Sequence, residues 1–294
     1  MGPYLLSELE RRKSRAIELH EKIDITDSVA IRNEVARFLA LIPRDEKAVI
    51  FHLAALSHVG KSWSGPAEVI SVNVGGTANI LAGLAELGFR GRFVYVSSAE
   101  VYGNQPQVDA INEAHPTLPL SPYAASKLAA EVFVQQVHRA HALDTVIARP
   151  FNHIGPGQSE SFLVSAIARR ITEAVRVGSP TIEVGNLGAI RDFLDVRDVV
   201  RAYCDLAETA LSGETYNISS GAGRSVAEVV KEMIRLSGAR LEVSVNPGLT
   251  RAIEVPRLVG DCTKLQEATG FRPLHSLEAT LGDVLQYWRG RPGV

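Results

Sequence analysis

The feature that most constrains the fold is a regular alternation of short apolar segments with helical ones, from residue 15 to about residue 155. "KAVIFHLAA" (47–55) and "RFVYVSSAEVYG" (92–103) are continuous apolar runs, as expected of strands buried on both faces of a sheet. Residues 15–19 read as another short strand, and "DTVIARPFNHIGPG" (144–157) begins with one. The alternation predicts an α/β fold with a doubly wound parallel sheet and helices on both of its faces.

Helical periodicity fills the intervals between these apolar runs. "DITDSVAIRNEVARFLALI" has Thr26 or Asp27 as an N-cap residue ahead of its helical pattern. Residues 66–88 are expected to form one helix that ends at a glycine, a residue common just beyond helix C-termini. A further helix contains "SPYAASKLAAE", residues 121–131, and follows a proline-rich loop.

Beyond residue 155 the pattern is less regular, with helices and strands in no fixed order. The predicted helices lie at 161–175, 196–211, 225–238 and 276–290, and the predicted strands at 181–187 and 214–221. We expect residues 1–155, with about 190–210, to form a Rossmann-type dinucleotide-binding domain. Residues 156–189 and 211–294 are expected to form a smaller α/β substrate lobe over the carboxyl ends of the strands, where open α/β sheets bind ligands.

Composition excludes several classes of protein. A net charge of −2 over 294 residues gives no basic footprint for nucleic acid. No apolar run is long enough to cross a bilayer. Cys204 and Cys262 lie far apart and have no partners at metal-ligand spacing, so we expect no metal site and a reduced, cytoplasmic protein.

A tyrosine lies four residues before a lysine in the predicted helix at 121–131. Positions i and i+4 lie one above the other on a helix, so Tyr123 and Lys127 point the same way. The unperturbed tyrosine pKa is about 10, and a nearby ammonium lowers it by favouring the phenolate. The pair therefore suits acid–base chemistry. An amphipathic helix with a half-buried tyrosine and a solvated lysine would show the same spacing.

The preceding strand supplies a third polar group to this region. Ser97 and Ser98 follow the apolar run that starts at residue 92, so they lie where strand ends line the ligand crevice. A hydroxyl there can hydrogen-bond a substrate carbonyl and share its proton with Tyr123. Simple capping of the strand end is the alternative role for either serine.

Seven segments resemble those of the extended short-chain dehydrogenases/reductases, in the NAD-dependent epimerase/dehydratase family. They are "FHLAALSHVGKSW", "NVGGTANIL", "VSSAEVYG", "SPYAASKLAAE", "ARPFNHIGPGQ", "VGNLGAIRDFLDVRDVVRAY" and "EVPRLVGDCTKL". They occur in the family's order and cover nearly the whole chain. Each is weak alone, but together they are specific.

The resemblance implies roles for individual residues. The catalytic Ser, Tyr and Lys of the family fall on Ser98, Tyr123 and Lys127, with Tyr123 as the acid/base. Tyr123 and Lys127 would also contact the cofactor, NADP(H) or NAD(H). The remaining expected cofactor residues are Gly2, Asp24, Ile25, Leu53, Ala54, Ala55 and Asn73.

Within the family, the similarity is greatest to enzymes of GDP-mannose-derived sugars. "RPFNHIGPGQ", "GNLGAIRDF" and "RAIEVPRLVGD" resemble the reductase that makes GDP-D-rhamnose from GDP-4-dehydro-6-deoxy-D-mannose. By this resemblance the GDP part of the substrate would be held by Asn152, Asn186, Arg191, Arg251 and Glu254. Arginine forks suit pyrophosphate, and a glutamate can accept hydrogen bonds from guanine or ribose.

The choice between two chemistries stays open in the sequence. A 4-ketoreductase needs only hydride transfer and a proton from Tyr123, whereas a GDP-mannose 4,6-dehydratase also needs a base. Glu100 stands where the dehydratases have that glutamate, although look-alike reductases can have it too. The later motifs favour the reductase. A catalytically impaired relative that binds cofactor as a scaffold is the alternative of a different class, and the retained Ser98, Tyr123 and Lys127 argue against it.

The start of the chain departs from the family pattern. A predicted amphipathic helix at 3–13 comes first, and Gly2 corresponds to the third glycine of the family's G-x-x-G-x-x-G loop. The first strand and two glycines have no counterpart, so we expect a start annotated roughly a dozen residues late, or a fragment. "ELHEK" (18–22) does not decide between NAD and NADP.

The resemblance also implies an assembly. Two subunits, or four, would pair through helices at 76–87 and 124–140 in a four-helix bundle. Apolar stripes on both helices are compatible with a homodimer of this kind.

Overall fold

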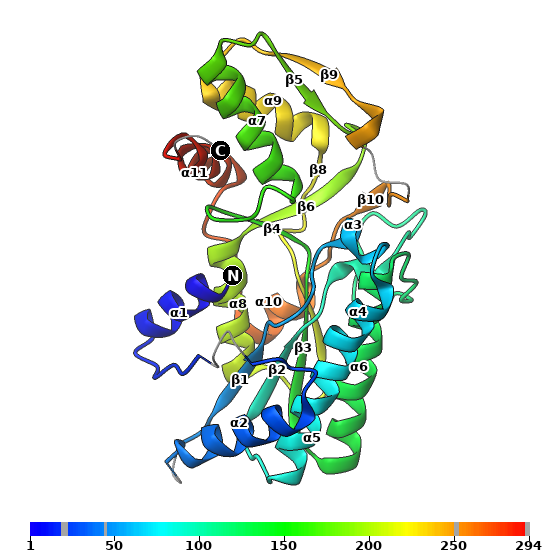
Figure 1. Ribbon diagram of the computed structural model, residues 1–294, viewed down its shortest axis with the longest axis vertical. Helices are drawn as coiled ribbons and strands as arrows, with labels where there is room; N and C mark the ends of the chain where they lie inside the picture. The colour runs from blue at the N-terminus through cyan, green and yellow to red at the C-terminus, as the bar shows by residue number, and fades with distance from the viewer. Residues whose placement is uncertain (19–22, 44–45, 250–252, 292–294) are drawn as a thin grey trace.

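A four-stranded parallel sheet forms the centre of the lower domain in Figure 1. The computed structural model describes residues 1–18, 23–43, 46–249 and 253–291. The strand order is β1-β2-β3-β7, and every pairing is parallel. The strands are β1 (Val49–His52), β2 (Arg92–Val96), β3 (Asp144–Pro150) and β7 (Thr215–Ile218).

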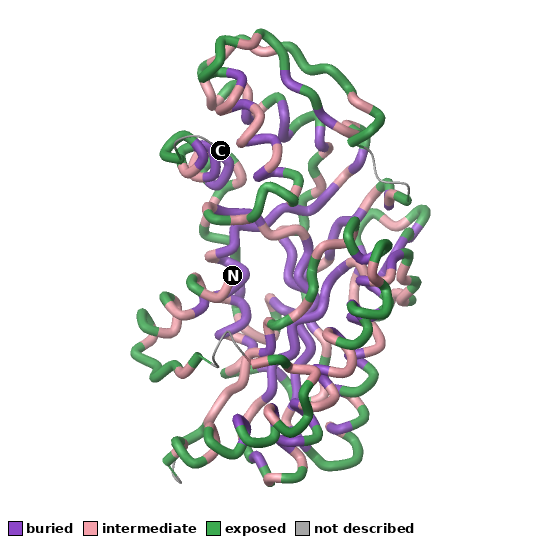
Figure 2. The backbone as a smooth tube through the Cα atoms, viewed as in Figure 1, coloured by how far each residue is buried: buried purple, intermediate pink, exposed green. Residues whose placement is uncertain are grey.

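Helices cover both faces of this sheet, which confirms the doubly wound α/β architecture (Figure 1). One face packs against α2 (Ser28–Ala40), α5 (Thr77–Glu86) and α6 (Pro122–His141). The other packs against α1 (Gly2–Arg11), α8 (Val196–Thr209) and α10 (Thr263–Thr269). β2, β3 and β7 are buried along most of their length, whereas the edge strand β1 is mostly half-buried (Figure 2). A strand buried on both faces has to be apolar throughout, which is the reason for the continuous runs in the sequence.

The segment predicted as one helix over 66–88 is three pieces in the structure. After the short helix α3 (Val59–Ser62) come α4 (Pro66–Ile70), a π-helical turn (Ser71–Gly76) and α5. Gly88 lies just past the end of α5 with a φ of 68°, as its predicted place beyond the C-terminus requires. At the start of α2 the N-cap is Asp27, whose carboxylate accepts from two backbone amides at 3.0 Å.

The second lobe lies over the carboxyl ends of the main strands (Figure 1). One small sheet contains β4 (Asn152–Ile154), β6 (Ile190–Asp195), β8 (Gly223–Ser225) and β10 (Arg257–Leu258), and another pairs β5 (Thr181–Val184) with β9 (Glu242–Val245). Its helices are α7 (Leu163–Val177), α9 (Val226–Ser237) and α11 (Leu277–Arg289). Short 3₁₀ turns lie at Ala99–Tyr102 and Pro247–Leu249. The three helices enclose a separate apolar core.

Two expectations about the chain's organisation were wrong in part. The strand expected at 15–19 is absent from its described part, since residues 15–18 pair with no strand there, and residue 19 lies outside the described residues. The division into domains is also more interleaved than 1–155 with 190–210 against 156–189 with 211–294. β7 lies within 211–294 but pairs with β3 in the main sheet, and β6 lies within 190–210 but belongs to the sheet of the second lobe.

The chain passes repeatedly between the two lobes, so a division by continuous ranges could not separate them. Among the described residues, none of the helices has the length and apolar character needed to cross a bilayer.

Candidate active site

Ser98 and Tyr123 meet at the carboxyl end of the main sheet. Ser98 follows β2 and caps the 3₁₀ turn, where its Oγ accepts from the Glu100 amide at 3.2 Å. Tyr123 lies in the first turn of α6, which is capped by Ser121 through the Ala124 amide at 3.1 Å. The Ser98 hydroxyl lies close enough to the Tyr123 phenol to act on its pKa in the lowering direction. The end of β2 and the start of α6 therefore bring the two hydroxyls into one region.

Lys127 follows one turn later on the same helix and is buried, with 3 % of its surface exposed. Its Nζ lies 4.7 Å from the centre of the Tyr95 ring, and the Tyr95 hydroxyl points back to the Lys127 carbonyl at 3.5 Å. Tyr123 in turn influences the Tyr95 pKa, so all three side chains share one region. The phenol and the ammonium therefore face the same side of α6.

The expected lowering of the Tyr123 pKa does not appear in the structure. Burial raises the pKa of Tyr123 to about 12, the Ser98 hydroxyl works in the lowering direction, and the Glu100 charge raises it further. Burial also lowers the pKa of Lys127 to about 7. A lysine with that pKa is only partly charged near neutral pH, which weakens its stabilisation of a phenolate on Tyr123.

Glu100 is close enough to act on the same phenol. Its backbone amide donates to Ser98 Oγ, and its charge raises the Tyr123 pKa. The prediction that Glu100 shares the site with Ser98 and Tyr123 thus has a geometric basis. A carboxylate in this place can accept a proton from a neighbouring carbon acid or hydroxyl.

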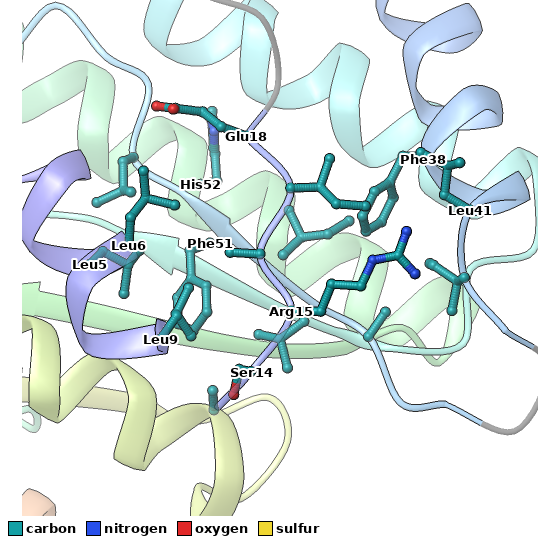
Figure 3. A pocket seen from close by; sticks show the side chains of 18 of the residues that line it. Leu5, Leu6, Leu9, Ser14, Arg15, Glu18, Phe38, Leu41, Phe51 and His52 are labelled. Atoms are coloured by element: carbon teal, nitrogen blue, oxygen red, sulfur yellow. The ribbon is translucent and has the colours of Figure 1, made fainter. Parts of the chain in front are cut away.

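A cavity of about 650 Å³ lies beside the β1 edge that faces away from β2. Four residues expected at the cofactor line it: Gly2 at the start of α1, Ile25, and Leu53 and Ala54 directly after β1. Figure 3 shows the leucines of α1 on one side and apolar residues of α2 and its C-cap on the other; the labelled ones are Leu5, Leu6, Leu9, Phe38 and Leu41. The cavity therefore runs from the ligand end of β1 into an apolar interior.

The other expected cofactor residues have different surroundings. Asn73 is buried and uses its amide within the protein, accepting from the Leu56 amide at 2.8 Å and donating to the Leu56 carbonyl and to Ser126 Oγ. It thereby fixes the loop after β1, which contains Ala55, against α6. Asp24 accepts from Thr26 at 2.7 Å in an exposed turn.

The expected substrate residues form a cluster in the second lobe. Asn186 Nδ2 donates to Glu254 Oε2 at 2.5 Å, and the Arg191 guanidinium lies 3.8 Å from Glu254 Oε1. Arg191 is on β6, and Asn152 on β4 pairs with Phe193 two residues further along that strand. Arg251 lies outside the described residues. The structure thus brings Asn186, Arg191 and Glu254 together, with Asn152 on the adjoining strand.

Two buried polar atoms on β4 lack partners among the described residues: Asn152 Oδ1 and His153 Nδ1. A buried polar atom without a partner is costly, so it is a natural contact for a polar ligand. Burial also lowers the pKa of His153 to about 4, which keeps the imidazole neutral. Groups of His, Cys, Asp and Glu suited to hold a metal ion are absent from the described part of the chain.

Sequence reasoning missed a buried polar layer behind the site. His52, at the end of β1, bonds Thr77 Oγ1 at 2.9 Å, and Glu131 forms an ion pair with Arg149 at 2.6 Å. The i, i+4 spacing of Lys127 and Glu131 was a usable signal for Glu131. No local signal existed for His52 or Arg149, because both lie inside apolar runs and meet their partners only through the fold.

Comparison with known proteins supports this architecture. Residues 5–284 match the model of the family described as GDP-mannose 4,6 dehydratase. The GDP-6-deoxy-D-mannose reductase of Pseudomonas aeruginosa is 35 % identical over 244 residues, covering 82 % of this chain and 80 % of that protein.

Solved structures give the same result for the fold. The structure of RMD from Pseudomonas aeruginosa complexed with NADPH has a TM-score of 0.88 and 31 % identity, covering 98 % of this chain and 95 % of that one. The UDP-glucose 4-epimerase of Thermus thermophilus in complex with NAD has a TM-score of 0.84 and 25 % identity, covering 98 % and 96 %. The chain therefore belongs to the GDP-mannose 4,6 dehydratase family of extended short-chain dehydrogenases/reductases.

Proposed function

We propose that the protein reduces the C4 ketone of a GDP-4-dehydro-6-deoxy-hexose, with NADPH or NADH as reductant. One observation carries the proposal: the Tyr123 phenol lies near the Ser98 hydroxyl, which acts on its pKa, and one helix turn from the buried Lys127. An acid/base, an orienting hydroxyl and a cation are what a carbonyl reduction requires of the protein. The reductase from Pseudomonas aeruginosa, at 35 % identity, supports the choice of substrate.

The protein's part in the reaction is to hold the ketone and to deliver a proton. The hydride for C4 is the chemistry that the reduced nicotinamide supplies when it is bound. Tyr123 gives its phenolic proton to the C4 oxygen as that oxygen gains negative charge. Ser98 donates to the same oxygen and orients it, and Lys127 stabilises the phenolate left on Tyr123.

The residues present fit a nicotinamide cofactor. The cavity at the end of β1 brings Gly2, Ile25, Leu53 and Ala54 together on the side where the adenosine would be held. Lys127 is buried, and its Nζ lies 4.7 Å from the centre of the Tyr95 ring and forms no ion pair among the described residues, which suits it to bind a ribose hydroxyl. Solved relatives of this fold contain NADPH or NAD. The Asn73 contacts hold the loop that carries Ala55 in place beside them.

The GDP end of the substrate would be held in the second lobe. Arg191 suits the pyrophosphate, and Glu254 with Asn186 offers acceptors and donors for the guanine or its ribose. The buried Oδ1 of Asn152 has no hydrogen-bond partner among the described residues, and a sugar hydroxyl would supply one. Arg251 stays in this proposed set because its sequence motif includes it.

The 4,6-dehydratase reaction is the second candidate, and the position of Glu100 favours it. Its charge acts on the Tyr123 phenol and its backbone amide donates to Ser98, so its carboxylate is a candidate base for removing the C5 proton of an oxidised sugar. The GDP-mannose 4,6 dehydratase description of the family model supports this candidate as well.

One experiment separates the candidates. The protein is incubated with GDP-4-dehydro-6-deoxy-D-mannose plus NADPH or NADH, and separately with GDP-mannose plus NADP⁺ or NAD⁺, which accepts the C4 hydride, and the products are identified by NMR. We expect a 4-hydroxy product and oxidation of the cofactor in the first incubation only. A 4-keto-6-deoxy product from GDP-mannose would establish the dehydratase, and turnover in neither would overturn both.

We also propose that the protein is a cytoplasmic homodimer that pairs through α5 and α6. Val132 and Phe133 on α6 are 55 % and 42 % exposed, and Ile70 on the adjacent α4 is 53 % exposed. A second copy of the same face would cover this apolar surface. Phe133→Glu should give a monomer in analytical ultracentrifugation, while Leu211→Glu, at a more exposed leucine after α8, should not. A dimer that survives Phe133→Glu would contradict this arrangement.

A further inference from the structure

Glu131 has no place in the proposed chemistry, yet it is 1 % exposed and lies directly below Lys127 on α6. Tyr123, Lys127 and Glu131 occupy positions i, i+4 and i+8, so they share one face of the helix. An ionised carboxylate in such a place is costly unless it is paired and hydrogen-bonded. The groups around Glu131 must therefore stabilise its charge.

Both oxygens of the Glu131 carboxylate accept hydrogen bonds. Arg149 on β3 donates to it through Nε at 2.9 Å and through Nη2 at 2.6 Å, which is the bidentate geometry of a strong pair. Ser97 Oγ donates to Oε1 of the same carboxylate. Arg149 also donates to the Tyr102 hydroxyl at 2.9 Å, and that hydroxyl donates to Asn217 at 2.7 Å.

This network connects the elements that carry the reacting groups. Ser97 immediately precedes Ser98, so its bond to Glu131 ties the end of β2 to the helix of Tyr123 and Lys127. Arg149 adds β3, and Asn217 adds β7. A buried ion pair adds little to stability compared with apolar residues of the same volume. The network therefore points to a role in setting geometry and charge.

Lys127 is the reacting-site residue whose charge this network can influence. The titratable or charged groups around it are Tyr123 and Glu131 on α6, His52 on β1, Tyr95 on β2 and Arg149 on β3. Burial lowers the pKa of Lys127 to about 7, and the Glu131 charge is the influence that opposes this. His52 is kept neutral by its own burial and by the Lys127 charge, so it adds no second positive charge beside Lys127.

We propose that Glu131 is a positioning residue for Lys127: with its carboxylate fixed by Arg149 and Ser97, it keeps Lys127 in the charged form beside Tyr123. This inference rests on the proposed reduction, because a charged Lys127 matters only if Tyr123 gives up a proton. Arg149 shields Glu131 from solvent and from reorientation, and Ser97 sets the distance between the serine strand end and the helix. The acid strength of Tyr123 thus depends on a carboxylate that never contacts the substrate.

The test replaces Glu131 by glutamine and reads Lys127 directly. Without the carboxylate, burial and the unpaired Arg149 both disfavour the ammonium, so the Lys127 pKa should fall by roughly one unit or more. NMR of protein with ¹³C-labelled lysine follows that titration, and Lys127→Gln assigns the signal. In the ketone reduction the alkaline limb of kcat should move to lower pH by the same amount. At pH 7.5 kcat should fall about tenfold, in proportion to the lost ammonium.

Two further variants keep the test decisive. Glu131→Leu with Arg149→Met removes the pair without leaving a buried charge, so it folds even where Glu131→Gln does not, and it should show the same shift. Asp198→Asn is the matched control, because Asp198 is a fully buried carboxylate paired with Arg201 and contacts none of Ser98, Tyr123 or Lys127. The Asp198→Asn variant should be less stable than wild type, and its Lys127 should titrate at the same pH as in wild type.

The outcomes distinguish this inference from the function on which it rests. A wild-type protein that does not reduce the keto sugar defeats the proposed function, while the NMR titration still reports on Glu131. A wild-type protein that turns over, with Lys127 titrating at the same pH in the Glu131 variants, would overturn the positioning role and leave a structural one.

Discussion

At the scale of single residues, burial decides the chemistry of the site more than spacing does. Tyr123 and Lys127 have the spacing of an acid–base pair, but desolvation is the largest influence on their pKa values. It raises the pKa of Tyr123 to about 12 and lowers the pKa of Lys127 to about 7. The bound substrate and cofactor change that desolvation. The fold therefore sets the positions of Tyr123 and Lys127, while their protonation states depend on the bound substrate and cofactor.

The first residue-scale prediction concerns the phenolic proton of Tyr123. Tyr123→Phe removes the proton donor and should lower kcat for ketone reduction by about 10²–10⁴-fold, as expected when a general acid is lost. Binding of the cofactor, measured by fluorescence titration, should change little. Tyr287→Phe, on α11 in the second lobe, is the matched control and should keep full activity. Retained turnover in Tyr123→Phe would remove that residue from the mechanism.

The second residue-scale prediction concerns His52. Burial lowers its pKa from 6.5 to about 3, so between those values the unfolded chain binds a proton that the folded chain does not. The free energy of unfolding should therefore fall as pH falls, by up to about 1.4 kcal/mol per pH unit. The His52 contribution is fully present above pH 6.5 and is lost towards pH 3.

His52→Gln keeps a donor for Thr77 Oγ1, which uses its own proton on the Asn73 carbonyl, and removes the titration. In urea unfolding, wild type should lose about 2 kcal/mol more than this variant between pH 7 and pH 5. Equal acid sensitivity of the two proteins would show that His52 is not the titrating group.

At the scale of elements, the informative case is the segment over 66–88. Its apolar periodicity predicted a helix correctly, yet the π-helical turn at Ser71–Gly76 had no sequence signal. π-helical turns are frequent at functional sites because one extra residue re-aims the side chains that follow. Here the turn contains Asn73, which holds the loop after β1. The tertiary contact explains the local irregularity.

Two neighbouring glycines in this turn give an element-scale prediction. A Cβ at Gly76 would lie 2.4 Å from Ile25 at the edge of the cavity, whereas a Cβ at Gly75 would meet nothing within 4 Å. Gly76→Ala should lower the free energy of unfolding by about 1–3 kcal/mol through overpacking. Gly75→Ala should raise it by about 0.5–1 kcal/mol, since alanine is the better helix former. Urea denaturation measures both, and equal effects would contradict the close approach of Ile25.

At the scale of the whole molecule, Asp192 ties the two lobes together. It is fully buried on β6 and accepts from the Ser220 amide at 2.8 Å, from Ser220 Oγ at 2.6 Å, from the Gly221 amide at 3.0 Å and from the Gly260 amide at 3.3 Å. Ser220 and Gly221 follow β7 of the main sheet, and Gly260 follows β10 of the second lobe. One carboxylate therefore satisfies donors from both parts of the fold.

Asp192→Asn should destabilise the whole protein. The amide turns one acceptor into a donor that faces other donors, and we expect a loss of about 3 kcal/mol in the free energy of unfolding. Glu232→Gln, in a surface pair with Arg235 on α9, is the control and should give no resolvable change. If both variants unfold at the same urea concentration as wild type, Asp192 is not a tie between the lobes.

The sequence by itself determined the fold class, because strands buried on both faces must be apolar throughout and helices between them must be amphipathic. It also located Ser98, Tyr123 and Lys127, since their positions follow from one strand end and one helix face. The tertiary structure alone decided what lies behind them. His52, Glu131 and Arg149 come from three different elements, and only the packing of those elements makes them neighbours. The sequence also did not show that β6 belongs to the second lobe and β7 to the main sheet. Strand pairing joins residues far apart in the chain and leaves no local pattern.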